Sequence, residues 1–446
     1  ALSCHAYAFH ARFITDRIDP SAYTPRREVW TDGPAPKVAV IGSGPAGLTA
    51  AHYLSLKGYH VTVFEKEDRP GGMLYCAIPG YRLPQEVIRR EIEAVLNDNI
   101  TVRCRMALGR EITVDGLLGE GYRAVLLALG AHESKPLKLE NEDCAGVHPS
   151  IEFLKAFNQR GEARARGRVG VIGGGNSAFD AARVALRQRD VESVTILYRR
   201  TREEMPAFAE EIEAAAQEGI DIQILVTPKK VLAKDGKLIG LECLRNRLGE
   251  IDESGRHRPV PIAGSEFRVD LETLIVAISE DSGVDAIGPA KQSGIAITDW
   301  NTVKVDKKTL LTTRPGVFAA GDVVRGPNTV VDAIADGKRA ARMIDRYVRG
   351  LELADAAEPA LPRVYVPPVS AELDDLPTVE RVETPRAPAA WRTRNFAEVE
   401  VALSVAEAHC EARRCLRCDL EFTRPPETGQ ETDHDGAVAV TGGKQL

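Results

Sequence analysis

The sequence lacks the features that mark secreted and membrane proteins. Its 446 residues contain only eight cysteines, too few for a disulfide scaffold in a chain of this length. No apolar run approaches the roughly 18 residues needed to span a bilayer, and the stretch 124–131 is far too short. The amino end has no basic-then-apolar signal pattern and no initiator Met, which indicates a processed or trimmed start. We therefore expect a cytoplasmic protein without a transmembrane segment.

An excess of basic residues is also missing. The chain has 58 Lys and Arg against 65 Asp and Glu, a net charge of −7, which argues against general nucleic-acid binding. Its nine histidines form no pair at metal or catalytic spacing, and it has no Gly-x-Ser-x-Gly or His-Glu-x-x-His motif. We therefore assign no catalytic acid or base and expect cofactors to carry the chemistry.

The chain does contain a strand–turn–helix–strand pattern twice. A short apolar run at 37–42 precedes helical spacing at 48–57 and a β-branched strand at 60–65. The same order recurs at 168–173, 177–189 and 193–198. Two such openings predict two α/β dinucleotide-binding domains of Rossmann type, each with a parallel sheet.

The remaining segments are less regular. Buried strands are predicted at 124–129, 274–278 and 317–320, and hairpins between 221 and 270 with Asp235-Gly236 as a turn. Seven prolines between Pro359 and Pro388 indicate an extended linker. A helix is predicted over roughly 396–414, and the last twenty residues read as disordered.

The first glycine loop follows the strand at 37–42 and opens a helix. Gly42 would permit the tight turn, Gly44 would let backbone approach a pyrophosphate, and Gly47 would allow close helix–strand packing. The helix amino end offers free N–H groups to phosphate, and Glu65 could accept from a ribose hydroxyl. The predicted dinucleotide-binding residues here are Gly42, Ser43, Gly44, Pro45, Ala46, Gly47 and Glu65.

The segment 314–322 is a predicted strand followed by Gly321-Asp322. It indicates which dinucleotide the first glycine loop binds. It resembles the second FAD motif of two-dinucleotide-domain flavoproteins, in which that Asp contacts the ribityl and phosphate region. The following loop enters a helix at Thr329-Val330, whose amino end could stabilise negative charge on a reduced flavin.

The second glycine loop carries a different signal. Gly173 and Gly175 are followed by Asn176 and Ser177, and the next strand ends in Arg199-Arg200 where an NAD site usually has an acid. A guanidinium pairs with a 2′-phosphate that a carboxylate would repel, so the sequence favours NADPH over NADH. The competing interpretation is that Arg199, Arg200 and Arg202 form surface ion pairs with Glu203 and Glu204.

Together these motifs closely resemble the glutamate synthase small-subunit family over roughly residues 30–350. Relatives include the NADPH-binding half of dihydropyrimidine dehydrogenase and the large subunit of NADH-dependent ferredoxin:NADP oxidoreductase. The resemblance implies an FAD domain interrupted by an NADPH domain, hydride transfer from NADPH to FAD, and onward electron flow through iron–sulfur clusters. It also implies that Glu65, Lys66, Gly72, Met73, Leu74 and Arg82 line the FAD, and that Asn176, Ser177, Arg199 and Arg200 line the NADPH.

On this basis the chain divides into seven parts. We expect an amino-terminal segment (1–34), an FAD domain in two parts (35–150 and 309–350), an inserted NAD(P)H domain (151–308), a proline-rich linker (351–395), a cysteine-bearing helical tail (396–426) and a disordered end (427–446).

The chain departs from the family pattern in three places. Only Cys4 precedes the FAD domain, where relatives commonly carry cluster cysteines. The segment 276–282 replaces the usual Gly-Gln-x-Pro-Asp turn. The stretches 394–399 and 411–418 resemble the opening of the family's cluster domain, but at the opposite end of the chain and without the cysteines that normally follow.

Three cysteines nevertheless cluster in this tail. The spacing of Cys410, Cys415 and Cys418 suits one [4Fe–4S] cluster, which normally takes four cysteine ligands. Cys4 or a cysteine of a partner chain could supply the fourth. A zinc site with His409, a redox-active dithiol at 415 and 418, or no special role are the alternatives.

The leading hypothesis is a flavoprotein subunit of a multi-subunit redox complex, partnered by iron–sulfur subunits and using FAD and NADPH, with NADH also open. The alternatives are a glutamate synthase small subunit proper, a thioredoxin-reductase-type disulfide reductase, and a non-catalytic dinucleotide-binding scaffold. The lack of amino-terminal cluster cysteines counts against the first, and the absence of Cys-x-x-Cys from the NADPH domain counts against the second.

Overall fold

A computed structural model of the chain describes residues 13, 15–18, 27–31, 33–252, 255–354, 382 and 385–412. The chain forms two compact units. One comprises Asp19–Asp355 with Arg386–Val401, and the other comprises Ala1–Ile18, Ala356–Pro385 and Ala402–Leu446. Among the described helices, none combines the length and the apolar character that crossing a bilayer would require.

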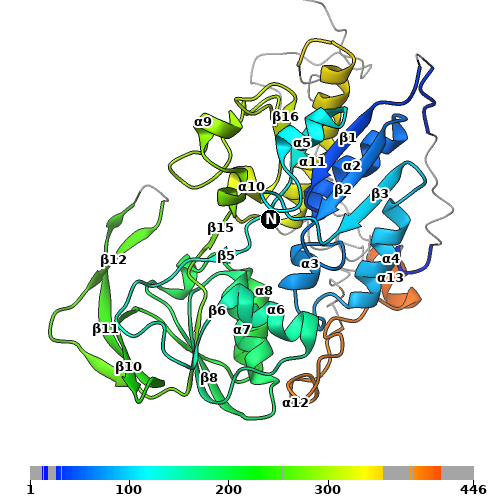
Figure 1. The fold of residues 1–446 in the computed structure, drawn as a ribbon. Helices are drawn as coiled ribbons and strands as arrows, with labels where there is room; N and C mark the ends of the chain where they lie inside the picture. The colour runs from blue at the N-terminus through cyan, green and yellow to red at the C-terminus, as the bar shows by residue number, and fades with distance from the viewer. Residues whose placement is uncertain are drawn as a thin grey trace, which may run out of the picture. The chain divides into compact units, whose positions relative to one another are not determined.

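The first parallel sheet of the larger unit is built around the strand that precedes the first glycine loop (Figure 1). Its order is β16-β4-β1-β2-β3, and every pair is parallel. Both faces of β1 are buried, so its side chains alternate between two cores. Val38 and Val40 pack with helices α2 and α11, whereas Ala39 and Ile41 pack with α5. The bounds are β1 (Lys37–Ile41), α2 (Pro45–Leu56), β2 (His60–Glu65), α3 (Met73–Cys76), α4 (Gln85–Val95), β3 (Ile100–Cys104), α5 (Val114–Gly119), β4 (Tyr122–Leu127), β16 (Val317–Ala319), α10 (Asp322–Arg325) and α11 (Val330–Val348).

A second parallel sheet repeats this arrangement around the second glycine loop. Its order is β6-β14-β7-β8-β9. Helices α6 and α7 supply most of its apolar partners, including Phe153 and Phe179, which are fully buried. The bounds are β6 (Val147–Pro149), α6 (Ser150–Arg160), β7 (Gly167–Ile172), α7 (Asn176–Leu186), β8 (Val191–Leu197), α8 (Ala209–Gln217), β9 (Asp221–Gln223) and β14 (Thr273–Val276).

An antiparallel sheet occupies the region where hairpins were predicted. The turn between β10 and β11 falls at Asp235 and Gly236, both with positive φ (52° and 71°), the backbone that a two-residue hairpin turn requires. Strand β11 also pairs with β12 and β13. The bounds are β10 (Val226–Lys234), β11 (Lys237–Ile251), β12 (His257–Pro261) and β13 (Phe267–Val269).

The second α/β region is inserted into the first. The chain passes between the two regions twice, at β5 (Glu133–Ser134) and at β15 (Glu280–Asp281). These two strands pair as a small antiparallel sheet. After β15, Val284 and Ile295 already pack in the core of the first sheet. The chain thus returns to the first domain before residue 284, earlier than the expected boundary at 308. The predicted fold class, two α/β domains with one interrupting the other, is confirmed.

The predicted helix over 396–414 is only partly correct. The structure has a short α12 (Ala389–Arg392) and a helix α13 (Val405–Ala412), with no helix at 396–404. Instead the Val399 N–H donates to the Tyr81 carbonyl (3.0 Å), and the Phe396 ring lies 4.3 Å from that of Phe157. Val399 N–H therefore bonds outside its own segment, which a helical bond would not allow. Most of the predicted linker and all of the predicted disordered end lie outside the described residues.

Candidate active site

The first glycine loop has the surroundings of a ligand cradle. A Cβ at Gly42 would lie 2.2 Å from the Ala128 carbonyl oxygen, and one at Gly47 would lie 2.0 Å from that of Gly42. Only glycine fits at either position. At Gly44 no atom lies within 4 Å of the Cβ position, so the space there stays open to a ligand. Gly44 caps α2 without a side-chain hydrogen bond, which leaves amino-terminal N–H groups of the helix for phosphate.

Glu65 holds the first glycine loop through hydrogen bonds to Ser43. Its buried carboxylate accepts from the backbone N–H of Ser43 (3.0 Å), from the Ser43 hydroxyl, and from the N–H of Glu67 (2.9 Å). A carboxylate offers about four lone-pair sites, so one remains for a ligand hydroxyl. Glu65 therefore fixes the loop as well as lining the cavity.

Asp322, the acidic residue of the predicted second FAD motif, lies just after strand β16. Gly321 has φ 78°, and a Cβ on it would come within 2.9 Å of Ala46, so the strand end sits directly against the first glycine loop. Burial raises the pKa of Asp322 to about 6, although a hydrogen bond from the backbone of Asn328 acts in the opposite direction. Thr329 caps α11, its hydroxyl accepting from the Asp332 N–H at 3.2 Å.

The second glycine loop repeats the geometry of the first. A Cβ at Gly173 would lie 2.1 Å from the Ala277 carbonyl oxygen, whereas the nearest atom to one at Gly175 is Pro206 Cγ at 4.0 Å. Gly175 caps α7 without a side-chain bond. Next to it, Asn176 Oδ1 accepts from the Phe208 N–H (3.1 Å), which fixes the Asn176 amide.

The two arginines after β8 have different surroundings. Arg200 is 3% exposed, and its guanidinium donates to the His257 carbonyl (2.7 Å) and to Asp252 (2.6 Å). Arg199 is accessible to solvent and forms no ion pair within the described part of the chain. Partial burial of the guanidinium against the cavity wall and the neighbouring charge of Arg200 lower the pKa of Arg199. The two residues therefore differ, because the Arg200 guanidinium is held by two contacts within the fold.

The alternative of surface ion pairs with the following glutamates is not what the structure has. Arg202 pairs with Glu213 (3.1 Å), and the Glu204 carboxylate accepts from the backbone N–H groups of Thr201 (3.3 Å) and His257 (2.7 Å). Arg199 lies at the cavity wall without such an ion pair among the described residues.

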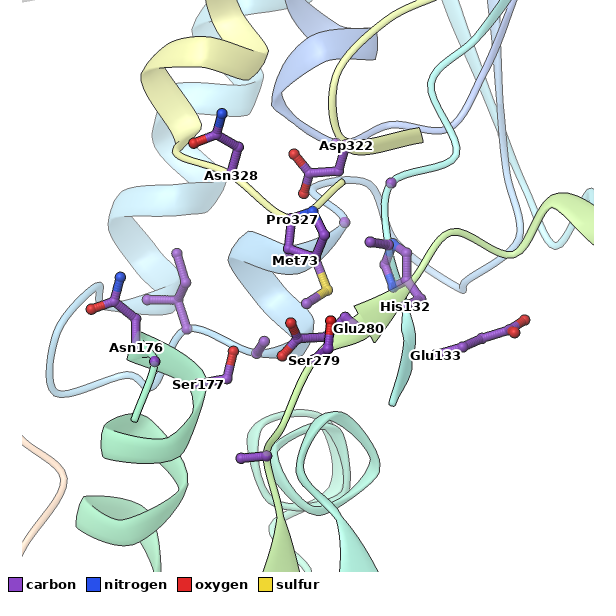
Figure 2. Close-up of a pocket in the computed structure, with 18 of the residues that line it drawn as sticks. Met73, His132, Glu133, Asn176, Ser177, Ser279, Glu280, Asp322, Pro327 and Asn328 are labelled. Atoms are coloured by element: carbon purple, nitrogen blue, oxygen red, sulfur yellow. The ribbon is translucent and has the colours of Figure 1, made fainter. Parts of the chain in front are cut away.

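Both glycine loops open into one cavity of about 1400 Å³. That volume exceeds the roughly 300–1,000 Å³ of a typical small-molecule pocket, so it has room for more than one ligand. Figure 2 shows Asn176 and Ser177 from one loop and Asp322 and Asn328 from the other domain around the same space, with Met73 between them in the view. Of the predicted site residues outside the cysteine tail, all but Gly47 line this cavity: Gly42, Ser43, Gly44, Pro45, Ala46, Glu65, Lys66, Gly72, Met73, Leu74, Arg82, Gly173, Gly175, Asn176, Ser177, Arg199, Arg200, Gly321, Asp322, Thr329 and Val330.

Several lining residues were not predicted from the sequence. His132 and Glu133 follow β4, and Ser279 and Glu280 follow β14 (Figure 2). Burial lowers the pKa of His132 to about 3, helped by the positive charge of Lys66, so its imidazole is neutral at pH 7. The signal that could have found these residues is their position just beyond the carboxyl ends of parallel strands, where open α/β sheets bind ligands.

The predicted cysteine site is only partly described. Cys410 lies on α13 with a free thiol, while Cys415, Cys418 and Cys4 lie outside the described residues. In the described segments, no three His, Cys, Asp or Glu side chains are grouped so that they could hold a metal.

Comparison with known proteins agrees with this architecture. A family model described as pyridine nucleotide-disulphide oxidoreductase matches residues 36–337. Among solved structures, Mycobacterium tuberculosis FprA in complex with NADPH superposes with a TM-score of 0.62 at 18% identity, over 71% of this chain and 85% of that one. T. acidophilum thioredoxin reductase superposes with a TM-score of 0.53 at 19% identity, over 70% of this chain and 98% of that one. At such identities the likeness shows the fold.

Curated relatives are more similar in sequence. The chain is 40% identical over 389 residues to the NADP(+)-dependent formate dehydrogenase subunit beta of Moorella thermoacetica, covering 86% of this chain and 54% of the relative. It is 37% identical over 415 residues to the NADPH-Fe(3+) oxidoreductase subunit beta of Geobacter sulfurreducens, covering 86% and 61%. It therefore spans between half and two thirds of the length of these two proteins.

A third relative is matched over more of its own length. The glutamate synthase [NADPH] small chain of Azospirillum brasilense is 34% identical over 346 residues, which cover 75% of this chain and 70% of the relative. The resemblance predicted from the motifs is thus confirmed, and so is the oxidoreductase class. The chain belongs to the pyridine nucleotide-disulphide oxidoreductase family and, within the proteins it matches, to those of the glutamate synthase small-chain type.

Proposed function

We propose that this chain is the flavoprotein subunit of a multi-subunit redox complex, in which hydride passes between NADPH and FAD and single electrons continue to iron–sulfur clusters. The observation that carries the proposal is the cavity that both glycine loops share. Each loop follows the strand at which the order of its parallel sheet reverses, β1 in one and β7 in the other. Ligands of open α/β sheets bind at that point.

The first loop would hold the FAD. The open space beside Gly44 and the uncapped amino end of α2 suit a pyrophosphate, and Glu65 retains an acceptor site for a ribose hydroxyl. Asp322 would accept from the hydroxyls of the ribityl chain. The amino end of α11 at Val330 also lines the cavity and favours a negative group there.

The second loop would hold the NADPH. Gly175 and the amino end of α7 suit its pyrophosphate, and Arg199 its 2′-phosphate. The fixed amide of Asn176 and the hydroxyl of Ser177 lie beside this loop and face the cavity. We accordingly propose that the first domain comprises about residues 35–130 and 283–350, and the second about 135–279.

The protein supplies position and environment for the transfer. FAD, when bound, accepts a hydride from a nicotinamide and releases electrons one at a time. Met73 and the segment 277–280 line the cavity with both loops and would restrict water between the two cofactors. His132, neutral at pH 7, adds no charge to this part of the wall. No side-chain acid or base is required for transfer of a hydride.

The onward electron path involves the cysteine tail and partner chains. Two relatives are named as beta subunits, one of a formate dehydrogenase and one of an Fe(3+) oxidoreductase, which supports assembly with other chains. We propose that Cys410, Cys415 and Cys418 ligate a [4Fe–4S] cluster with a fourth ligand from Cys4 or a partner, and that the partners are iron–sulfur subunits. Free thiols at five described cysteines are consistent with a reducing cytoplasm.

Purification from the native source tests the assembly. We expect the chain to co-purify with other subunits, and the complex to contain one FAD per copy of this chain together with iron and sulfide. An amidotransferase-sized partner with glutamate synthase activity would instead assign it as a glutamate synthase small chain, which its similarity to that of Azospirillum brasilense also allows. A chain recovered without flavin or partners would contradict the proposal.

A further inference from the structure

A two-stranded ribbon extends from the antiparallel sheet beyond the point where β10 ends its pairing. Strand β11 is fifteen residues long, and only its first part pairs with β10, up to Arg245 opposite Val226. Its later part pairs with β12, with Leu248 opposite Pro259 and Ile251 opposite His257. Figure 1 shows β11 and β12 as this ribbon.

The end of the ribbon is fastened to the segment that follows β8. Arg200 donates to the carbonyl of His257 (2.7 Å) and to the carboxylate of Asp252 (2.6 Å). In addition, the His257 N–H donates to the Glu204 carboxylate (2.7 Å), and the Asn246 side chain donates to the Arg199 carbonyl (2.8 Å). Four hydrogen bonds therefore fix the ribbon beside Arg199.

Because of this attachment, the ribbon brings a second arginine to the cavity. Arg256 lies between Asp252 and His257 in the turn region, and its carbonyl accepts from the Asp252 N–H at 2.7 Å. Arg256 lines the same cavity as Arg199. The two are close enough that the charge of Arg256 lowers the pKa of Arg199. Two guanidinium groups thus line one wall, where their positive charges favour a dianionic ligand, while the nearby Asp252 carboxylate acts in the opposite direction on the pKa of Arg199.

We infer that Arg256, presented by the β11–β12 ribbon, is a second cationic ligand of the NADPH 2′-phosphate beside Arg199, and that Arg200 is a positioning residue that holds the ribbon in place. This inference rests on the proposed function. Guanidinium groups bind phosphate through paired N–H donors, and two of them can contact separate oxygens of one phosphate. Specificity for NADPH would then depend on Arg256, which lies 79 residues after Ser177 of the glycine loop.

Equilibrium binding of NADP⁺ and NAD⁺ to the FAD-loaded protein, measured by titration calorimetry, tests the inference. For Arg256→Ala we expect the Kd for NADP⁺ to rise roughly ten- to hundredfold, as for loss of a charge-assisted contact, and the Kd for NAD⁺ to change less than twofold. Arg258→Ala is the matched control, since it removes the same charge from the same ribbon at an exposed residue that does not line the cavity. It should alter neither constant. Arg256→Lys should give a Kd for NADP⁺ between those of the unaltered protein and Arg256→Ala. An unfolded variant would not bind with such an intermediate Kd.

The outcomes separate this inference from the proposed function. If the unaltered protein shows no preference for NADP⁺ over NAD⁺, the assignment of the second loop to NADPH is wrong. If it prefers NADP⁺ and only Arg199→Ala removes the preference, the role of Arg256 is wrong and the proposed function stands. An equal weakening of both dinucleotides by Arg256→Ala would also overturn the inference, because a phosphate ligand must discriminate between them. A thermal melt of each variant identifies any that is unfolded, and Arg256→Lys then serves as the deciding variant.

Discussion

Arg82 and Asp180 form an ion pair at 2.9 Å that joins the first α/β domain to helix α7 of the second. The same guanidinium lies 3.1 Å from Glu211. The resemblance had implied that Arg82 lines the FAD. It does line the cavity, but its guanidinium is held by two carboxylates of the other domain. Arg82 thus links the two α/β domains, and the shared cavity depends on how these domains are positioned.

The ion pair predicts a particular dependence of stability on pH. Burial raises the pKa of Asp180 to about 6, although Arg82 acts to lower it. A raised pKa means that the folded protein binds this proton more tightly than the unfolded chain, so the contribution of Asp180 to stability falls as pH rises from about 4 to 6. Asp180→Asn carries no such charge. Its free energy of unfolding should therefore rise relative to wild type over that interval, by roughly 1–3 kcal/mol.

Chemical denaturation of both proteins at several pH values measures this difference. Glu86→Gln is a suitable control, because Glu86 forms an exposed ion pair with Arg89 on α4. Its difference from wild type should stay small throughout. A difference between Asp180→Asn and wild type that moves the other way with pH would show that Arg82, and not burial, dominates at Asp180.

The two glycines with open Cβ positions give a matched pair of variants. A Cβ atom at Gly44 would meet no atom within 4 Å, and one at Gly175 would meet only Pro206 at 4.0 Å, so we expect the fold to tolerate a valine at either position. Each side chain would instead occupy the space proposed for a pyrophosphate. We expect Gly44→Val to be purified without FAD, and Gly175→Val to retain FAD but lose binding of NADPH.

Flavin content after purification and calorimetric binding of NADPH measure the two effects, and each variant is the control for the other. Full flavin occupancy in Gly44→Val would refute the assignment of the first loop. Loss of flavin from both variants would point to general damage, which melting temperatures would reveal.

Arg199→Ala should reduce discrimination between the two nicotinamide dinucleotides. Loss of a charged contact costs about 1.5–3 kcal/mol, so the ratio of kcat/KM for NADPH to that for NADH should fall roughly ten- to hundredfold. Arg202→Ala is the control, since Arg202 pairs with Glu213 at the surface. A ratio unchanged by Arg199→Ala, or a wild-type preference for NADH, would contradict the assignment.

The cluster proposal predicts a separation of two activities. In the assembled complex, Cys415→Ser should lower the iron content and block electron transfer to the downstream acceptor, while NADPH still reduces the flavin. Cys144→Ser, at a single partly buried thiol, should leave both unchanged. Unchanged iron and unchanged electron transfer in Cys415→Ser would exclude the cluster.

The strands of both domains could be predicted from sequence because their signals are local. The β-branched run at His60–Glu65 matches β2 at both ends, and the predicted strand at 168–173 is one residue from β7. The glycine loops were predictable for the same reason, because the glycines of each loop lie within six residues of the end of the preceding strand. The roles of residues that depend on distant partners were not. Arg200 is held by Asp252, and nothing in the sequence near Arg200 indicates that contact.

The segment 396–404 illustrates the same limit. A helix was predicted there, but the Val399 N–H donates to the Tyr81 carbonyl, outside its own segment. Contacts across the fold thus override a weak local preference. His132 and Glu280 lie just beyond strand ends that the sequence predicts, but only the meeting of two separate strand ends brings them into one cavity.

Anaerobic addition of NADPH to the purified FAD-loaded protein tests the central claim most directly. If the two loops hold FAD and NADPH in one cavity, one equivalent of NADPH should bleach the yellow flavin, and Gly175→Val should retain the colour under the same conditions. A wild-type protein that contains FAD and binds NADPH, yet keeps its flavin oxidised, would contradict the account.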